Sequence, residues 1–192
     1  MIILYSSNIK NDVIELDKNE SHHCINVMRK KVDDRVIVID GKGNSCTCTI
    51  TDIKKNIVLL MVIKRSQLQK KINNLHIGIA PTKSQDRLEW FIEKAVEIGV
   101  EEITFLKTKR TERRKINIHR CIKISISAMK QSGQLYLPKL NDITDYTAFI
   151  DGCSEESLYI GSLQGNDSKR YFYDSYQNGT KCCFLIGPEG DF

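Results

Sequence analysis

Cationic side chains concentrate in one stretch of this sequence. Nine lysines and arginines lie between Lys107 and Lys130, against a single acid, Glu112. From Leu140 onward the balance reverses, with three bases and nine acids. A basic block of this kind is typical of a surface that faces a polyanion, and nucleic acid is favoured over a membrane. The alternative is an ordinary solvated face.

Two short apolar runs each lead into a glycine-rich segment. Leu158 to Leu163 contains the start of GSLQG, and Cys182 to Ile186 runs into GPEG. Both runs are too short for a helix, so they predict buried strands that end in sharp loops. Ligands of open α/β sheets lie beyond the carboxyl ends of the strands, where glycine brings the backbone close to the ligand. The pattern therefore predicts a site for a small nucleotide-like ligand.

Several common catalytic motifs are missing from the sequence. PTKSQD stands where a dinucleotide fingerprint would follow the first strand of the second half, and no phosphate-binding P-loop is present. A G-x-S-x-G elbow and a Cys/His pair suited to covalent hydrolysis are also missing. We therefore expect a reaction that needs little side-chain machinery. The sequence identifies no general base, so the catalytic residues stay unknown.

The cysteines indicate a reducing compartment. The chain has seven of them, an odd number, and no C-x-x-C pair. They are expected to be reduced residues of the core or of strands in a cytoplasmic protein. His22, His23 and Cys24 lack a second ligand cluster, so no metal site is predicted. The polar residues that follow Leu4 lead us to expect no export signal, and no apolar run is long enough to span a membrane.

Residues 1 to about 70 predict a small barrel-like β domain. A helix from Glu20 to Arg29, with Ser21 as N-cap, interrupts the β pattern. Arg29 at its end either favours the helix terminus electrostatically or binds phosphate. Four short segments rich in β-branched residues predict the strands. They are Ile2 to Tyr5, Arg35 to Asp40, Ser45 to Ile50 and Ile57 to Ile63.

A polar linker, Ser66 to Asn74, precedes a change of pattern. Leu75 to Ala80 predicts a strand, Ser84 to Ile98 a helix with Ser84 as N-cap and Gly99 as its stop, and Ile103 to Leu106 the next strand. This order predicts a parallel sheet with a right-handed crossover. The basic block then falls on a loop and on the outer face of a helix whose apolar stripe is expected to include Ile118, Ile122, Ser125 or Ile126, and Met129.

Five segments together resemble one known family across essentially the whole chain. They are HHCINVMRKKVDDRVIVIDGKGN, IAPTKSQDRLEWFIEKAVEIGVEEITFL, KRTERR, SAMKQSGQLYLPKL and FLIGPEG. In this order and spacing, the sequence resembles the ribosomal RNA small subunit methyltransferase E family. Members of that family methylate N3 of a uridine in 16S ribosomal RNA, and they belong to the SPOUT class of knotted methyltransferases.

The resemblance implies a fold and a set of partners. We expect a PUA-like RNA-binding small β-barrel in residues 1–70 and a SPOUT α/β domain with a parallel sheet in residues 73–192. The implied cofactor is S-adenosylmethionine, and the implied partners are 16S rRNA or the small ribosomal subunit and a second copy of the chain as a homodimer. Neither a membrane nor a metal is implied.

The resemblance also assigns a cofactor loop, and charge and position suggest the RNA contacts. Ile186, Gly187, Pro188, Glu189 and Gly190 map onto the first cofactor loop, with Gly161 and Ser162 nearby. The candidates for contact with RNA phosphates or bases are Arg29, Lys83, Arg110, Arg113 and Arg114.

This sequence departs from the family pattern in three places. The pattern continues past GPEG with a helix, a strand and a further loop and helix, whereas this sequence ends at Phe192. We therefore expect the knot to stay open and this polypeptide to be inactive and to bind cofactor poorly; tight S-adenosylmethionine binding in a calorimetric titration would contradict that. Gln134 stands where an arginine is usual, and Asp191 where a second glycine is usual.

Two other classes of function stay open. A non-catalytic RNA-binding protein explains the basic block but leaves the glycine-rich strand ends without a ligand, and cofactor binding separates the two. A metabolic nucleotide-binding enzyme explains those ends but not the basic block. RNA affinity that falls steeply with salt would argue against this second alternative.

Overall fold

The chain divides into two compact units. The computed structural model describes residues 1–69, 75–154, 157–162, 171–176, 179–189 and 192. Unit 1 comprises Met1–Lys70 with Ile126–Leu137, and unit 2 comprises Lys71–Ser125 with Pro138–Phe192. The ranges predicted from the sequence, 1–70 and 73–192, stay a prediction of the functional domains. The structure adds that residues 126–137 pack with the first unit.

Unit 1 is built on a five-stranded sheet in the order β1-β3-β4-β5-β2. The β1–β3 pair is parallel, and the other pairs are antiparallel. All four strands expected from the sequence are present, and β4 and β5 are longer than predicted because their β pattern continues into polar residues. The three-residue strand β2 was not predicted. The strands are β1 (Ile3–Tyr5), β2 (Val13–Glu15), β3 (Arg35–Ile39), β4 (Asn44–Lys54) and β5 (Ile57–Gln67).

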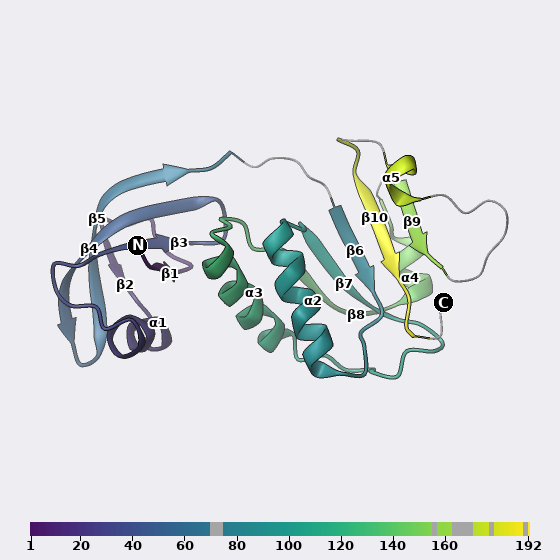
Figure 1. The fold of residues 1–192 in the computed structure, drawn as a ribbon, viewed down its shortest axis with the longest axis horizontal. Helices are drawn as coiled ribbons and strands as arrows, with labels where there is room; N and C mark the ends of the chain where they lie inside the picture. The colour runs from purple at the N-terminus through teal and green to yellow at the C-terminus, as the bar shows by residue number, and fades with distance from the viewer. Residues whose placement is uncertain (70–74, 155–156, 163–170, 177–178, 190–191) are drawn as a thin grey trace. The chain divides into compact units, whose positions relative to one another are not determined.

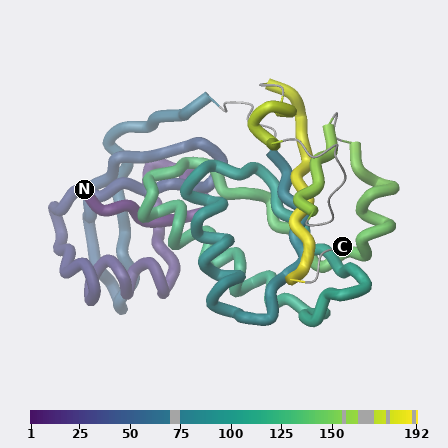
Figure 2. Tube along the Cα trace, turned by 45° about the vertical axis from the view of Figure 1, so that its right-hand side comes forward, coloured from purple at the N-terminus to yellow at the C-terminus, as the bar shows by residue number. Residues whose placement is uncertain are grey.

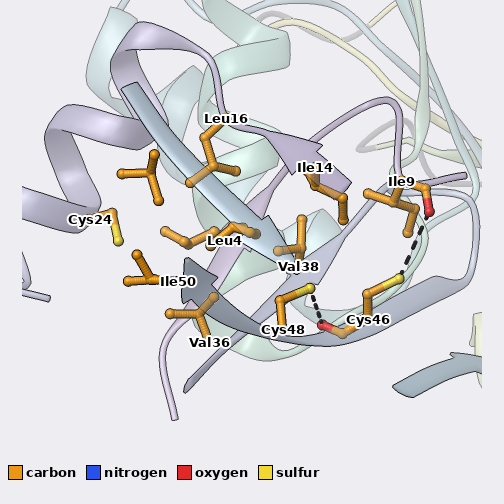
Figure 3. Close-up of a cluster of buried hydrophobic side chains, with 12 residues drawn as sticks. Leu4, Ile9, Ile14, Leu16, Cys24, Val36, Val38, Cys46, Cys48 and Ile50 are labelled. Carbon is orange, nitrogen blue, oxygen red and sulfur yellow. Dashed lines mark hydrogen bonds between the residues drawn. The ribbon is translucent and has the colours of Figure 1, made fainter. Parts of the chain in front are cut away.

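Inward-facing residues of these strands form the core of unit 1, as Figure 3 shows. Cys46, Cys48 and Ile50 alternate inward along β4, as the sequence predicts, and each is at most 1% exposed. The Cys48 Sγ lies 3.7 Å from the carbonyl oxygen of Cys46. Burial, reinforced by the neighbouring Cys46, raises the pKa of the Cys48 thiol to about 12. The cysteines therefore behave here as small apolar residues.

The helical insertion starts earlier than expected. Helix α1 (Lys18–His22) continues into a π-helical turn, η1 (His23–Val27). The N-cap is Asp17, whose carboxylate accepts a hydrogen bond from the Glu20 amide, so the prediction of Ser21 as N-cap is wrong. Ser21 is buried instead, and its hydroxyl donates to the Leu16 carbonyl and accepts from the Val58 amide. The hydroxyl therefore fastens the helix to β5.

The second piece of unit 1 is anchored by a partly buried ion pair. Lys130 Nζ lies 2.6 Å from Glu20 Oε1, and the two side chains are only 15% and 12% exposed. The other carboxylate oxygen of Glu20 accepts a hydrogen bond from the Tyr5 amide. This network gives residues 126–137 a fixed attachment to the β sheet of unit 1.

Unit 2 contains a wholly parallel sheet in the order β8-β7-β6-β10-β9, with β10 between β6 and β9 in Figures 1 and 2. Helix α2 (Gln85–Ile98) covers one face, together with the first half of α3 (Ile118–Ser132), and α4 (Tyr146–Asp151) packs on the other. Both faces are therefore covered, as parallel sheets require. The strands are β6 (Leu75–Ile79), β7 (Glu102–Lys107), β8 (Lys139–Asp145), β9 (Ser157–Gly161) and β10 (Cys182–Ile186).

The helices of unit 2 confirm some sequence predictions and correct others. Ser84 caps α2, and Gly99 ends it in the left-handed conformation at φ 85°, as expected. In α3 the predicted positions Ser125 and Met129 are fully buried and Ile118 packs against the core of unit 2, as expected. Ile122 is only half-buried, and the neighbouring Cys121 is buried in its place. The helices α4 and α5 (Phe172–Ser175) and the strand β8 were not predicted.

Gly78 sits in the middle of β6, where three side chains converge. A Cβ atom at this position would lie 2.8 Å from Leu185, 3.1 Å from Leu106 and 3.3 Å from Phe149. The absence of a side chain therefore lets β10 and α4 pack closely against the centre of the sheet.

Candidate functional site

The carboxyl ends of four parallel strands meet at one edge of the unit 2 sheet. Ile186, the last residue of β10, pairs with Ile79 of β6 on one side and with Gly161 of β9 on the other. Strand β7 lies on the far side of β6. The segments that follow β6, β7, β9 and β10 therefore leave the sheet from the same edge, where open α/β sheets bind ligands.

The predicted cofactor loop begins at this edge. Ile186, Gly187 and Pro188 are half-buried, and Glu189, Gly161 and Ser162 are exposed, so the backbone of this segment is within reach of a ligand. The Ala80 amide donates to the Ile186 carbonyl at 2.9 Å, which ties the exits of β6 and β10 together. Gly190 lies outside the described residues.

A second contact links the same two exits. Glu189 Oε1 lies 4.0 Å from an Nη atom of Arg87, near the start of α2. Both side chains are mostly exposed, so this pair adds little stability. It does leave a carboxylate beside the glycine-rich loop, where it can accept hydrogen bonds from a ligand.

The side chain of Arg113 makes three hydrogen bonds to the segment that follows β6. Its Nε donates to the Thr82 carbonyl at 2.9 Å, and its two Nη groups donate to the Lys83 carbonyl at 2.5 Å and to Gln85 Oε1 at 2.8 Å. The guanidinium is partly buried. A planar fork of donors suits this arrangement, and a lysine could not reproduce it. Arg113 therefore holds the β6 exit in place.

The basic loop after β7 contains a turn that is held by its own hydrogen bonds. Thr111 is only 3% exposed, and its hydroxyl oxygen accepts from the Thr108 amide at 2.9 Å and lies 3.4 Å from the Leu106 carbonyl. The Arg110 amide donates to Thr108 Oγ1. With the threonines fixed, the side chains of Arg110 and Arg114 are held on the exposed side of the turn.

The other predicted RNA contacts have different surroundings. Lys83 is exposed and lies 3.1 Å from Glu112, in a pair that is also mostly exposed. Arg29 belongs to unit 1, where it is exposed just after the π-helical turn and has a φ of 53°. The structure thus brings Lys83, Arg110, Arg113 and Arg114 to one edge of unit 2, and it places Arg29 in the other unit.

A basic cavity of about 790 Å³ lies beside the start of α3. Arg120 forms a two-pronged ion pair with Glu89, with donor–acceptor distances of 2.6 and 2.9 Å. Hydrogen bonds from Arg120 and then from Gln85 hold the pKa of Glu89 below its usual range. Charge of this kind suits phosphate oxygens. The cavity is lined by Gln85, Arg113, Lys115, Ile116, Asn117, Ile118, His119 and Arg120.

The sequence predicted exposed residues at the carboxyl edge of the unit 2 sheet, but it did not reveal the residues that hold the loops of that edge in place. The roles of Thr111, Gln85 and Arg87 went unpredicted. A threonine pair at i,i+3 spacing, Thr108 and Thr111, was the one available signal of a self-bonded turn. The clasp by Arg113 left no such signal, because its acceptors lie about thirty residues earlier in the chain and two of them are backbone carbonyls.

The aromatic residues before β10 form a cluster at the surface of unit 2, in which Phe172 is still 38% exposed. Phe172 stacks on Tyr176 at 5.5 Å and meets Tyr159 and Phe184 edge-on, each at 4.9 Å. Tyr171 and Tyr173 are more than 80% exposed. The cluster therefore packs on β9 and β10, with two tyrosines left on the surface.

The opposite half of the sheet carries a polar network. Glu102 of β7 accepts hydrogen bonds from Lys139 at 2.8 Å and from Asn141 at 2.6 Å, and Asn141 also donates to Thr104. Burial alone would raise the pKa of Glu102, but the hydrogen bonds from Lys139 and Asn141 outweigh it and hold that pKa below its usual value. The network joins β7 to the edge strand β8.

The part of the chain that the structure describes offers no metal centre and no membrane span. Within it, no group of three or more His, Cys, Asp or Glu side chains is arranged to hold a metal ion. Among the same residues, no helix has the length and apolarity that crossing a bilayer requires.

Comparison with known proteins identifies the two parts of the chain. A family model described as an RNA methyltransferase domain matches residues 69–192, and one described as an RNA methyltransferase PUA domain matches residues 16–62. The ribosomal RNA small subunit methyltransferase E of Rickettsia conorii is 28% identical over 194 residues, covering 100% of this chain and 78% of that protein.

Solved structures show the same fold over the whole chain. The crystal structure of a probable rRNA-methyltransferase from Porphyromonas gingivalis is 31% identical with a TM-score of 0.88, covering 100% of this chain and 82% of that one. A ribosomal RNA small subunit methyltransferase E from Neisseria gonorrhoeae, bound to S-adenosyl methionine, is 24% identical with a TM-score of 0.88, covering 100% and 81%. The resemblance inferred from the five motifs is confirmed, and this chain belongs to the ribosomal RNA small subunit methyltransferase E family of RNA methyltransferases.

Proposed function

We propose that this protein transfers a methyl group from S-adenosylmethionine to N3 of a uridine in the 16S rRNA of the small ribosomal subunit. The observation that carries the proposal is the shared carboxyl edge of unit 2, where the exits of β10 and β9 lie beside the exit of β6, which Arg113 clasps from the basic loop. A protein that only bound RNA would leave the glycine-containing exits without a ligand.

The donor set at this edge fits the cofactor. Glu189 offers a carboxylate to ribose hydroxyls or to an ammonium group, and Gly187 and Gly161 let a ligand approach the backbone closely. Pro188 restricts the loop at the point where it leaves β10. When bound, S-adenosylmethionine supplies a methyl group on a positively charged sulfur, which is already an activated electrophile. On this proposal the residues Gly161, Ser162 and Ile186 to Gly190 hold it.

The chain's remaining task is to place the uridine and ease the loss of its N3 proton. Arg110 and Arg114, presented by the Thr111 turn, and Lys83 beside them supply positive charge at the same edge. A nearby cation favours the anionic form of an acid and so lowers the pKa of the uridine ring. The base must be unpaired or turned out of its stack, because pairing blocks N3. We assign no residue as the general base.

We further propose that the protein acts as a homodimer in the cytoplasm, on free 16S rRNA or on the small subunit. Trp90 and Ile98 lie on one stripe of α2 and are 63% and 72% exposed, which favours a covering surface from a second copy. Light scattering of the purified protein tests this point, since a monomeric mass would contradict it.

Mass spectrometry of rRNA nucleosides tests the activity. Cells that lack the gene are expected to lose 3-methyluridine from 16S rRNA, and the reintroduced gene is expected to restore it. An Arg110→Ala/Arg114→Ala version should restore less, whereas a Lys64→Ala version, altered at an exposed position of β5 in unit 1, should restore it fully. Persistence of 3-methyluridine in the deletion strain would refute the proposal.

A further inference from the structure

A separate cavity lies wholly within unit 1. Its volume is about 560 Å³, which is ample for part of a nucleotide chain. Three segments form it: the loop after β1, the turn between β3 and β4, and the end of β5. The lining residues are Ser7, Ile9, Lys10, Asp40, Lys42, Asn44, Ser45, Cys46, Arg65, Ser66 and Gln67.

One wall of this cavity is held by Arg65. Its guanidinium donates to the carbonyls of Ile9 and Asn11 and to a carboxylate oxygen of Asp12, the last two at 2.8 and 3.3 Å. The loop of residues 9–12 is therefore fastened to β5, and the cavity is preformed on this side.

The opposite wall is a turn held from within. Asp40 Oδ1 accepts from the amides of Lys42 and Asn44 at 2.8 and 3.1 Å, and Oδ2 accepts from the Asn44 side chain at 2.7 Å. These three bonds engage both carboxylate oxygens, and Asp40 is only 7% exposed. The only acidic lining residue is thus occupied within its own turn.

The segment 135–137 braces the same turn. Leu135 accepts from the Gly43 amide and Leu137 donates to the Gly41 carbonyl, both at 2.9 Å. Gly43 has a φ of 90°, and a Cβ there would lie 2.2 Å from the Tyr136 hydroxyl. The positive φ would strain any side chain at this position, and the Tyr136 ring would have to move to make room for it.

The lining chemistry indicates what this rigid cavity can bind. Lys10 and Lys42 are exposed at its rim, whereas the charge of Arg65 is paired with Asp12 and the carboxylate of Asp40 is bonded within its own turn. Three serine hydroxyls and two side-chain amides offer further hydrogen bonds, and none of the lining residues is aromatic. Phosphate oxygens and ribose hydroxyls match this set, whereas stacking of bases would need aromatic faces.

We infer that this cavity binds the phosphate–ribose backbone of a single-stranded segment of the RNA substrate, with Lys10 and Lys42 contacting phosphates. The inference rests on the proposed function, because it supposes that RNA is the substrate. It adds a sequence-independent anchor in unit 1 to the base-selecting edge of unit 2. Phosphate contacts position a protein on RNA without reading sequence.

The test is the salt dependence of binding to a fluorescently labelled single-stranded oligouridylate, followed by anisotropy. Each lysine that contacts a phosphate contributes about 0.7 to the slope of log affinity against log salt for a single strand. The Lys10→Ala/Lys42→Ala protein is therefore expected to lose about 1.4 from the slope and about tenfold in affinity at low salt. A Lys18→Ala/Lys64→Ala control, which removes two exposed lysines of unit 1 outside the cavity lining, should keep both values.

The outcomes separate this inference from the proposed function. If the unaltered protein binds no oligouridylate, the cavity inference is overturned, whereas the proposed function is tested separately by the loss of 3-methyluridine from the deletion strain. If it binds, but the Lys10/Lys42 variant keeps the same slope and affinity while its circular dichroism shows a native fold, the cavity inference is overturned. As a second measurement, photo-crosslinking of a 4-thiouridine oligonucleotide should label peptides spanning 7–12 or 40–46, and labels confined to 107–116 would also overturn it.

Discussion

Two arginines, one in each unit, do the same structural work in different surroundings. Arg65 holds the loop 9–12 through three acceptors, and Arg113 holds the loop 82–85 through three others. Arg65 stands on a strand beside a cavity that lysines rim. Arg113 stands inside a run of cations, at the edge where a glycine-rich loop begins. The comparison teaches that a basic block mixes residues that build a surface with residues that face its ligand.

The two arginines are also expected to differ in how much stability is lost when each is removed. Arg113 serves a loop that must stay in register with two neighbouring strand exits, so its loss would disturb several segments at once. Arg65 has a side chain that is 40% exposed, and it holds a loop at the surface of its own unit. Solvent can replace part of what Arg65 supplies, so we expect a smaller effect there.

The largest effect is expected for Arg113→Ala. The loss of three charge-assisted hydrogen bonds from a partly buried group should destabilise unit 2 by about 3 kcal/mol. Denaturant unfolding measures this, and hydrogen exchange should rise in residues 80–85. Arg113→Lys should recover only a minor part, because a lysine has no planar fork. Unchanged stability together with weakened RNA binding would break the comparison, since Arg113 would then be a ligand contact.

Arg65→Ala in unit 1 is expected to destabilise the protein less than Arg113→Ala does. The expected loss is about 1–2 kcal/mol, because the guanidinium is partly solvated and water can satisfy some of its acceptors. Hydrogen exchange should increase in residues 9–12 and stay unchanged in residues 80–85. Lys64→Ala, on the preceding residue of β5, is the matched control and should leave both loops as they are.

Glu102 is expected to make the stability of unit 2 depend on pH in the acid range. Its pKa is lower in the folded chain than in the unfolded one, so its contribution to stability is present above the ordinary carboxyl range and is lost as the pH falls through the folded value. Glu102→Gln is expected to cost about 1 kcal/mol at neutral pH and to flatten the decline in acid. Urea unfolding at a series of pH values measures both. An acid profile identical to that of the unaltered protein would show that the network does not carry this dependence.

The smallest effect on stability is expected for Arg114→Ala. This side chain is exposed, so the free energy of unfolding should change by no more than about 0.5 kcal/mol. The salt slope of single-stranded RNA binding should nevertheless fall by about 0.7. This result would show that Arg114 contacts RNA, whereas Arg113 stabilises the fold. A large loss of stability with an unchanged salt slope would show instead that Arg114 stabilises the fold and does not contact RNA.

Periodic and locally capped elements were predictable from the sequence. Helix α2 has both of its expected caps because Ser84 and Gly99 act on adjacent backbone, and β10 has the expected bounds because Gly187 stops a short apolar run. Strand β8 was missed because KLNDITD mixes polar and apolar residues, as an edge strand can. Ser21 looked like a cap, but packing against β5 decided its place, and Asp17 took the role.

The position of the candidate site was predictable from the sequence, but the arrangement of its side chains was not. Glycine-rich strand exits pointed to the carboxyl edge because parallel strands share that edge. The choice among Arg110, Arg113 and Arg114 depends on which of them meets distant carbonyls, and a run of similar cations does not reveal that. The assignments of cofactor and RNA contacts to individual residues stay predictions.

Gly78 shows how a position remote from any ligand can govern a binding loop. A methyl group added there would press first on Leu185, which stands directly before Ile186 at the mouth of the glycine-rich segment. Because Cβ atoms project from the face of a sheet, the extra bulk would displace the side chains of Leu185, Leu106 and Phe149. Leu185 would carry that disturbance to within one residue of the loop. A Gly78→Ala substitution is therefore expected to disturb the glycine-rich loop from inside the sheet, without altering any residue of the loop itself.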